Sequence, residues 1–301
     1  MAQVQLLVTA SALAFADRLR DENDPLTLFD FPAFAVGEIG VRGVALPASL
    51  LTGLKPVDLE AIRDAADKAR CPTLLLIEDQ PQPLADPDPA VRAEATERIR
   101  RLSQASGMLG SAQLGVSIDG ADGEDRFEIA ASTVREAMQT IDRFEVGVLL
   151  ESTAGITEDP GRLTDLIKKI GGFRIGSLPD FRFAHDSGDF EGTLRRLAPY
   201  AGTILATLGS SARGRKPATA SKDKTPYDLE AGLEAVLAVG YQHAICLDHA
   251  GGRNALPMMI EARETIERFI NPEEDEPEVV PVDGEPGETD AEGGDAPEGG
   301  E

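Results

Sequence analysis

The chain has 301 residues, of which 42% are hydrophobic, and a formal net charge of −24. Of its 53 acidic residues, 13 lie in 271–301, which contains no Lys or Arg, so residues 1–270 carry 40 acids against 29 bases. Because both parts are acidic, the chain repels a polyanion, which argues against a nucleic-acid partner. No run of 18 apolar residues occurs, and no basic segment opens the N-terminus. We therefore expect a cytoplasmic protein without a signal peptide or a membrane contact.

Short β-type runs alternate with longer amphipathic runs eight times along residues 1–270. The predicted strands are 3–9, 41–46, 73–78, 114–119, 146–151, 173–178, 203–208 and 244–248. The predicted helices are 28–38, 57–70, 91–108, 130–143, 159–170, 190–198, 227–239 and 254–270. Such alternation is typical of a parallel sheet with helical crossovers, and eight units favour closure into a (β/α)8 TIM barrel. No GxGxxG sequence follows the first strand, so a dinucleotide site is not indicated.

Residues 271–301 differ sharply in composition from the rest of the chain. Pro, Gly, Asp and Glu dominate this segment. It has too few apolar residues to offset the entropy lost on ordering, so we predict a disordered acidic tail after a single barrel domain of residues 1–270.

Only two cysteines occur, Cys71 and Cys246, and each adjoins an apolar run. No CxxC spacing indicates a metal site. We therefore predict two buried free thiols in a reducing compartment.

Carboxylates stand at the ends of several predicted strands, where the active sites of such barrels lie. They are Glu78, Asp79, Asp119, Glu151, Asp180 and Asp248. A ring of carboxylates is costly unless a cation or protons neutralise it, and oxygen ligands suit Mg²⁺ or Mn²⁺. The alternative for any single one of them is the N-cap of the following helix, a position that Asp favours.

Three segments resemble a known family. They are Val148–Gly155, Gly176–Phe181 with its Pro-Asp-Phe, and 233–248, in which a Gly-Tyr pair precedes the last strand and its final acid. These segments resemble the sugar phosphate isomerases/epimerases of the xylose isomerase-like TIM-barrel superfamily. The likeness is clearest over residues 146–270 and is only architectural before them.

The resemblance implies a divalent metal, Mn²⁺ or Mg²⁺, held by Glu, Asp, His and Glu at the ends of strands five to eight. The two Glu positions also form the acid/base pair that moves a proton beside a sugar carbonyl. Carried over, Glu151 is the first ligand and the base, Asp180 is the second ligand, and Asp248 is the last ligand and the second catalytic group. His185 is a candidate for an additional imidazole ligand.

The chain departs from the family pattern on strand seven and after strand five. Leu205 stands where the family has its His ligand, and Ser152-Thr153 replaces the common Asn-His. A leucine cannot bind a metal. Mg²⁺ accepts water in place of a protein ligand, so three carboxylates still permit a metal site.

Cationic and glycine-rich segments follow strands seven and eight. Arg213, Arg215 and Lys216 follow strand seven, and Arg253 and His249 follow strand eight beside Gly251-Gly252. We predict that these residues bind the anionic or polar groups of a sugar or sugar phosphate. The alternatives are a solvated loop and a glycine turn.

Three functions are therefore weighed. The first is a metal-dependent sugar isomerase or epimerase. The second is a metal-free or non-catalytic barrel that binds a sugar or a partner chain, and a homo-oligomer is compatible with both. The third, an endonuclease of the same superfamily, requires a His-rich zinc cluster, and three histidines in the whole chain argue against it.

Overall fold

The computed structural model describes residues 6–209, 224–250 and 254–271. Within them, eight parallel strands form one sheet in the order β6-β5-β4-β3-β2-β1-β8-β7. The strands are β1 Leu7–Ser11, β2 Val44–Pro47, β3 Thr73–Gln82, β4 Gln113–Ile118, β5 Gly147–Glu151, β6 Ile175–Leu178, β7 Thr203–Leu208 and β8 Ala244–His249. The predicted acidic tail beyond Asn271 lies outside the described residues.

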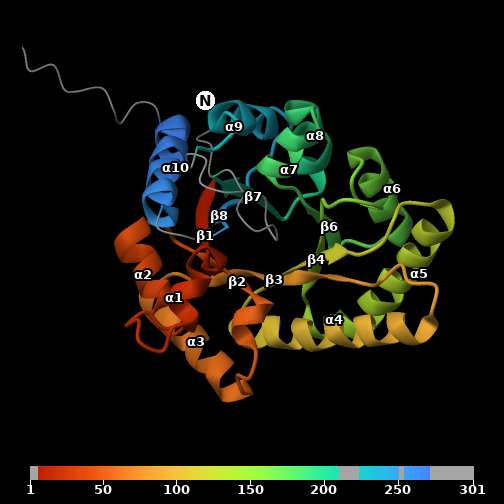
Figure 1. Cartoon of the computed structure of the whole chain (residues 1–301), viewed down its shortest axis with the longest axis horizontal. Helices are drawn as coiled ribbons and strands as arrows, with labels where there is room; N and C mark the ends of the chain where they lie inside the picture. The colour runs from red at the N-terminus through yellow and green to blue at the C-terminus, as the bar shows by residue number, and fades with distance from the viewer. Residues whose placement is uncertain (1–5, 210–223, 251–253, 272–301) are drawn as a thin grey trace, which may run out of the picture.

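Helices follow the strands and lie around the sheet (Figure 1). They are α1 Ala16–Arg20, α2 Phe31–Phe34, α3 Pro56–Ala69, α4 Pro89–Leu109, α5 Glu124–Ile141, α6 Pro160–Ile170, α7 Phe181–Asp186, α8 Phe190–Leu197, α9 Leu229–Leu237 and α10 Ala255–Ile270. Five short 3-10 or π turns complete the described part: η1 Ala12–Phe15, η2 Ala35–Ile39, η3 Ala48–Leu51, η4 Asp142–Phe144 and η5 Ala198–Tyr200. No helix in the described ranges is long and apolar enough to cross a membrane.

The sheet closes on itself at a thin seam between β6 and β7. β1 pairs with both β2 and β8, so the strands curl around a common interior. At the seam there is no regular ladder; isolated bridges join Ser177 to Ala201 and Asp180 to Leu205. The Leu205 N–H donates to the Pro179 carbonyl at 2.8 Å. The predicted (β/α)8 barrel is therefore confirmed, with its weakest backbone pairing next to Asp180.

Element boundaries differ from prediction where local signals are weak. The first strand begins at Leu7 and extends to Ser11, because its partners are Ala244 on β8 and Val44–Ala45 on β2. The predicted helix 28–38 is instead α2 continued by the π turn η2, which ends at Gly40 with φ +86°. The short helix α7 has no counterpart in the prediction, because six residues are too few to show a helical period.

Two apolar layers fill the fold. A large cluster lies between the strands and the helices, and a smaller one lies inside the barrel. The interior cluster consists of Ala45, Leu75, Ile77, Leu149, Leu178, Leu205 and Cys246. It is a packed floor rather than a pore, as in other barrels of eight strands. Cys71 and Cys246 are both buried and neither forms a disulfide, as predicted, and burial raises the pKa of the Cys71 thiol to about 11.

Candidate functional site

A polar layer lies directly above the apolar floor on the half of the barrel formed by β5 to β8. Each polar residue follows a floor residue by two positions: Glu151 after Leu149, Asp180 after Leu178, Thr207 after Leu205 and Asp248 after Cys246. Because side chains alternate along a strand, residues two apart face the same side. The predicted carboxylates of strands five, six and eight therefore share the interior of the barrel mouth.

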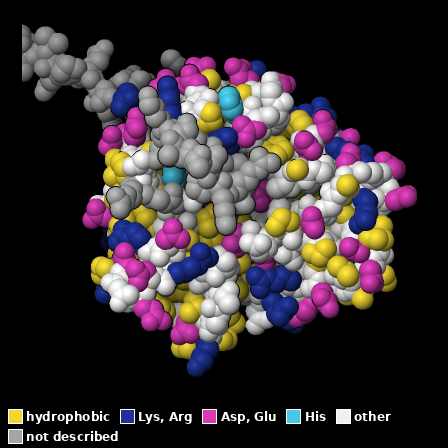
Figure 2. Space-filling view, in the orientation of Figure 1, with side chains coloured by type: hydrophobic (Ala, Val, Ile, Leu, Met, Phe, Trp, Pro, Cys, Tyr) yellow, Lys and Arg dark blue, Asp and Glu magenta, His cyan; other side chains and the backbone are white. Residues whose placement is uncertain are grey.

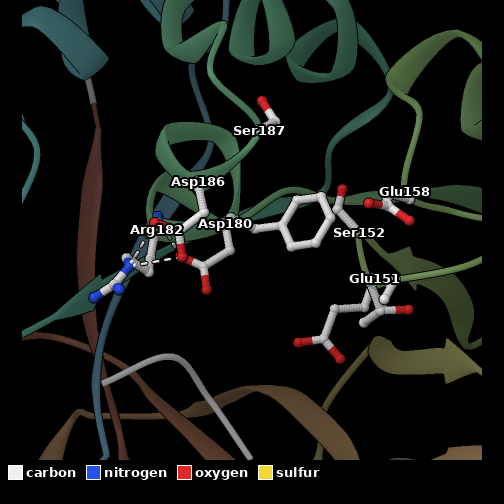
Figure 3. A pocket seen from close by; sticks show the side chains of 10 residues that line it. Glu151, Ser152, Glu158, Asp180, Arg182, Asp186 and Ser187 are labelled. Atoms are coloured by element: carbon white, nitrogen blue, oxygen red, sulfur yellow. Dashed lines mark hydrogen bonds and ion pairs between the residues drawn. The ribbon is translucent and has the colours of Figure 1, made fainter. Parts of the chain in front are cut away.

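A pocket of about 320 Å³ opens beside this layer. Its lining consists of Glu151, Ser152, Thr153, Ala154, Glu158, Asp180, Arg182, Phe183, Asp186 and Ser187. Figure 3 shows Glu151 and Glu158 on one side of the pocket and Asp180, Arg182 and Asp186 on the other. The pocket therefore joins the end of β5 to the start of α7. Asp248 is fully buried and does not belong to this lining.

Asp180 is held by three hydrogen bonds. Its Oδ1 accepts from the backbone N–H of Arg182 at 2.9 Å, which caps α7, and from that of Thr207 at 3.2 Å. Its Oδ2 accepts from the Thr207 hydroxyl at 2.7 Å. The carboxylate thus ties β6 to β7 where the backbone ladder is missing. Asp180 therefore lies at the barrel mouth, as predicted, and also caps α7, which was the alternative role for a strand-end acid.

The electrostatics of Asp180 reflect its burial. Desolvation raises the pKa of its carboxyl from 3.8 to about 6; the hydrogen bonds from Thr207 and Arg182 oppose the rise, and the nearby charge of Asp248 adds to it. This carboxyl therefore changes charge in the mildly acidic range, unlike an exposed aspartate.

We expect this titration to appear in the stability of the protein. Between about pH 4 and 6 the folded state binds more protons at Asp180 than the unfolded state, so its contribution to the free energy of unfolding decreases as pH rises through that window. Asp180→Asn removes the titration. Urea unfolding of both proteins at pH 4, 5, 6 and 7 in EDTA tests this: wild type should lose stability relative to the variant with rising pH. Parallel profiles would contradict the assignment.

The pairing of β7 with β8 bears on which residue of strand seven corresponds to the family's His position. The sequence resemblance placed Leu205 at the family's His position. In the structure Leu205 pairs with Cys246 in the apolar floor, whereas Thr207 pairs with Asp248. The strand-seven residue level with the last acid is therefore Thr207, and its hydroxyl is already donated to Asp180.

The predicted histidines lie away from the pocket lining. The ring of His185, on α7, packs against Phe190 and Tyr227 with centroid separations of 6.2 and 6.4 Å. His249 is buried at the end of β8, one residue after Asp248, and so faces the opposite side of the sheet; it lies against Gly209. Their predicted roles stay predictions, as do those of Arg213, Arg215, Lys216 and Arg253, which lie outside the described residues.

The other strand-end carboxylates serve local contacts. Glu78 is buried and forms an ion pair with Arg98 of α4 at 2.6 Å. Asp79 accepts a hydrogen bond from the Ser49 backbone in η3 at 3.0 Å. Asp119 is exposed. None of these three acids lines the pocket that contains Glu151 and Asp180.

Sequence reasoning did not single out Arg182 or Thr207. The Arg182 Nε donates to both oxygens of Asp186, at 3.1 and 3.0 Å, and its Nη1 donates to the Gly209 carbonyl at 3.1 Å. It thereby fixes α7 against the end of β7. Its spacing of four residues from Asp186 was a signal for the ion pair on a helix, whereas the role of Thr207 depends on strand register alone.

The donor set at the mouth does not match a resident divalent metal. Across residues 6–209, 224–250 and 254–271, no group of three or more His, Cys, Asp or Glu side chains is arranged to hold a metal ion. Both oxygens of Asp180 already accept hydrogen bonds, and Thr207 uses its hydroxyl as a donor to one of them.

Comparison with known proteins places the chain by its fold. No protein-family model and no curated protein matches the sequence. Among solved structures, D-psicose 3-epimerase from Clostridium cellulolyticum H10 is 15% identical, with 88% of this chain and 99% of that chain covered and a TM-score of 0.69. A xylose isomerase domain protein from Planctomyces limnophilus is 15% identical, with 90% and 99% covered and a TM-score of 0.65.

A third similar structure is the IOLI protein, described with a bound zinc atom. It is 12% identical, with 89% of this chain and 97% of that chain covered, and its TM-score is 0.64. The three likenesses extend over nearly the whole of each solved chain. The chain has the fold of the xylose isomerase-like barrels, and the resemblance inferred from residues 146–270 is confirmed at the level of the fold.

Proposed function

We propose that this protein is a sugar isomerase or epimerase that moves a proton at the carbon beside a carbonyl. The observation that carries the proposal is the position of Glu151. It ends β5 in the interior row of the barrel and lines the pocket at the carboxyl-terminal mouth, where barrels of this kind perform their chemistry. The structural neighbours include a D-psicose 3-epimerase, which supports a sugar as the substrate.

In this proposal Glu151 is the general base that removes the proton. Asp248 is the second acid/base group of the pair; because it is fully buried outside the pocket lining, it acts through the neighbouring carboxyl of Asp180, which lines the pocket and returns the proton. Thr207 holds Asp180 between them, and the charge of Asp248 acts on the carboxyl of Asp180. A positioned acid or base of this kind contributes roughly 10²- to 10⁴-fold in rate.

Exchange of substrate protons with solvent tests the activity itself. The protein is incubated in D₂O with a panel of ketopentoses, ketohexoses, aldoses and their phosphates, and deuterium at the carbon beside the carbonyl is followed by NMR. The proposal expects incorporation, accompanied by an isomer or epimer, for at least one member of the panel. A panel without any incorporation above a protein-free control would overturn the proposal.

The finer prediction of a Mn²⁺ or Mg²⁺ cofactor has weaker support than the activity. The zinc-containing IOLI structure favours a metal, but the donor set described above opposes one in this chain. We expect proton exchange to continue after dialysis against EDTA, with a rate that added Mn²⁺ changes less than about tenfold. Activity lost on chelation and restored by Mn²⁺, together with stoichiometric Mn²⁺ binding by electron paramagnetic resonance, would establish the metal-dependent form instead.

The second candidate is a barrel that binds a sugar or a partner chain without catalysis. It is favoured by the pairing of Thr207 and Leu205 with Asp248 and Cys246, which leaves no imidazole at the predicted strand-seven position. Calorimetric titration distinguishes the two. Binding of a sugar that shows no deuterium incorporation, and whose affinity is unchanged in Glu151→Gln, would favour this candidate over the isomerase.

A further inference from the structure

Phe173 is the most exposed large hydrophobic residue in the described part of the chain. The residue is 91% exposed, against 64% for Val57, the next in order. It stands in the connection between α6 and β6, directly after Gly171 and Gly172, whose φ angles are +75° and +94°. Because residues with side chains rarely adopt such angles, the glycine pair allows the turn that leads into Phe173. Single exposed apolar residues are common on protein surfaces, so the ring indicates a contact surface only if it is continuous with further apolar surface.

A hollow lies beside this ring. It has a volume of about 370 Å³ and is lined on its apolar side by Met138, Ile141 and Val146. Phe173 itself forms part of the wall, with Arg135 and Arg174 among the polar lining residues. The ring and the hollow therefore belong to one continuous surface, which we call the Phe173 patch: Arg135, Met138, Gln139, Ile141, Asp142, Val146 and Gly171–Arg174.

We propose that the Phe173 patch is a self-association surface that binds the same patch of a second copy of this chain. A two-fold dimer places identical patches face to face, so each copy must provide both a protruding group and a receiving hollow. The Phe173 patch provides both, side by side. Phe173 of each copy enters the hollow of the other, and two aromatic anchors in apolar pockets are the arrangement that dominates many interfaces.

The charges around the patch also suit a two-fold contact. Arg174 Nη1 lies 3.1 Å from Asp142 Oδ1, and its Nη2 lies 3.7 Å from Glu145 Oε1. Both acids are largely exposed, with side-chain exposures of 81% and 83%. The rim beside Phe173 thus carries both charge signs, and a second copy turned by half a rotation can set its Arg174 against these acids. A partner of a single charge sign would repel part of this rim.

The location of the patch separates it from the proposed active site. It is built from the end of α5, the start of β5 and the connection into β6, at the amino-terminal end of the strands. α5 and α6 lie at one side of the barrel in Figure 1. The pocket of Glu151 opens at the opposite, carboxyl-terminal end. Association through the patch leaves both pockets open, so this proposal does not depend on the proposed function.

Sedimentation velocity across the micromolar range tests the proposal with the full chain. Wild type should form a dimer, and Phe173→Ser should weaken the dimer by at least about tenfold while leaving the melting temperature of the monomer unchanged, because the exposed ring contributes little to the domain core. Val57→Ser, an exposed apolar position on α3, is the matched control and should remain dimeric. A wild type that is monomeric throughout, or a Phe173→Ser variant that dimerises normally, would overturn the proposal.

A mixing experiment then tests the reciprocal geometry. Gln139 is exposed on α5 at the lining of the hollow, so Gln139→Arg obstructs the hollow without disturbing the core. Neither Phe173→Ser nor Gln139→Arg retains an intact contact in its own homodimer. An equimolar mixture retains one of the two contacts and should form a heterodimer of intermediate affinity. A mixture that associates no better than either variant alone would show that a second copy does not occupy the hollow.

Discussion

Replacing Glu151 by Gln is expected to lower the rate of proton exchange into the sugar by about 10²- to 10⁴-fold, because the amide retains the shape of the side chain but cannot accept the proton. Glu151 is the carboxylate that both ends β5 and faces the pocket. The measurement is deuterium incorporation from D₂O for whichever sugar the wild type exchanges, at saturating concentration so that kcat is read separately from KM.

Glu158→Gln is the matched control for this loss. Glu158 lines the same pocket, but its Oε2 accepts from the backbone N–H of Gly155, so it serves the loop rather than the interior row. We expect this variant to change the exchange rate less than about tenfold. If Glu151→Gln keeps its rate while Glu158→Gln loses it, the base has been assigned to the wrong carboxylate, although the reaction type would stand.

The second large effect concerns strand seven. Leu205→His is expected to destabilise the fold by about 3–5 kcal/mol, because it removes a buried leucine from the apolar floor and places a polar ring there without a partner. Thr207→His, at the level of Asp248, should cost about 1–3 kcal/mol through the lost hydrogen bond to Asp180, and about 1–3 kcal/mol more because a larger ring must fit at a fully buried position. Chemical denaturation measures both values.

The affinity for Mn²⁺ is a second property in which Leu205→His and Thr207→His are expected to differ. An imidazole at position 207 stands beside the carboxylates of Asp180 and Asp248, so Thr207→His should bind Mn²⁺ at least about tenfold more tightly than wild type. Leu205→His should show no gain, because position 205 belongs to the apolar floor and pairs with Cys246 rather than with Asp248. A Leu205→His variant that is both stable and improved in Mn²⁺ binding would show that the strand register assigned here is wrong.

The composition and periodicity of the chain were sufficient to predict the architecture. Eight apolar runs alternating with amphipathic runs leave a parallel closed sheet as the arrangement that buries all of them, and β7 matches its predicted bounds, residues 203–208, at both ends. The strand-end rule also located Glu151, Asp180 and Asp248, because a carboxylate that follows an apolar strand must emerge at its carboxyl end. The same rule included Glu78, which points instead to Arg98 in the helix layer.

The tertiary structure decided which strand-end groups meet. A one-residue change of register turns a side chain from the interior to the helix layer, and no local pattern in the sequence specifies register between strands that are far apart in the chain. The register between β7 and β8 sets Thr207 rather than Leu205 level with Asp248, and the alternation of side chains along β3 directs Glu78 to Arg98 in the helix layer. The sequence determined the barrel and the acids at its strand ends, whereas strand pairing and side-chain alternation determined that Glu151 and Asp180 line one pocket and that Asp248 is buried behind it.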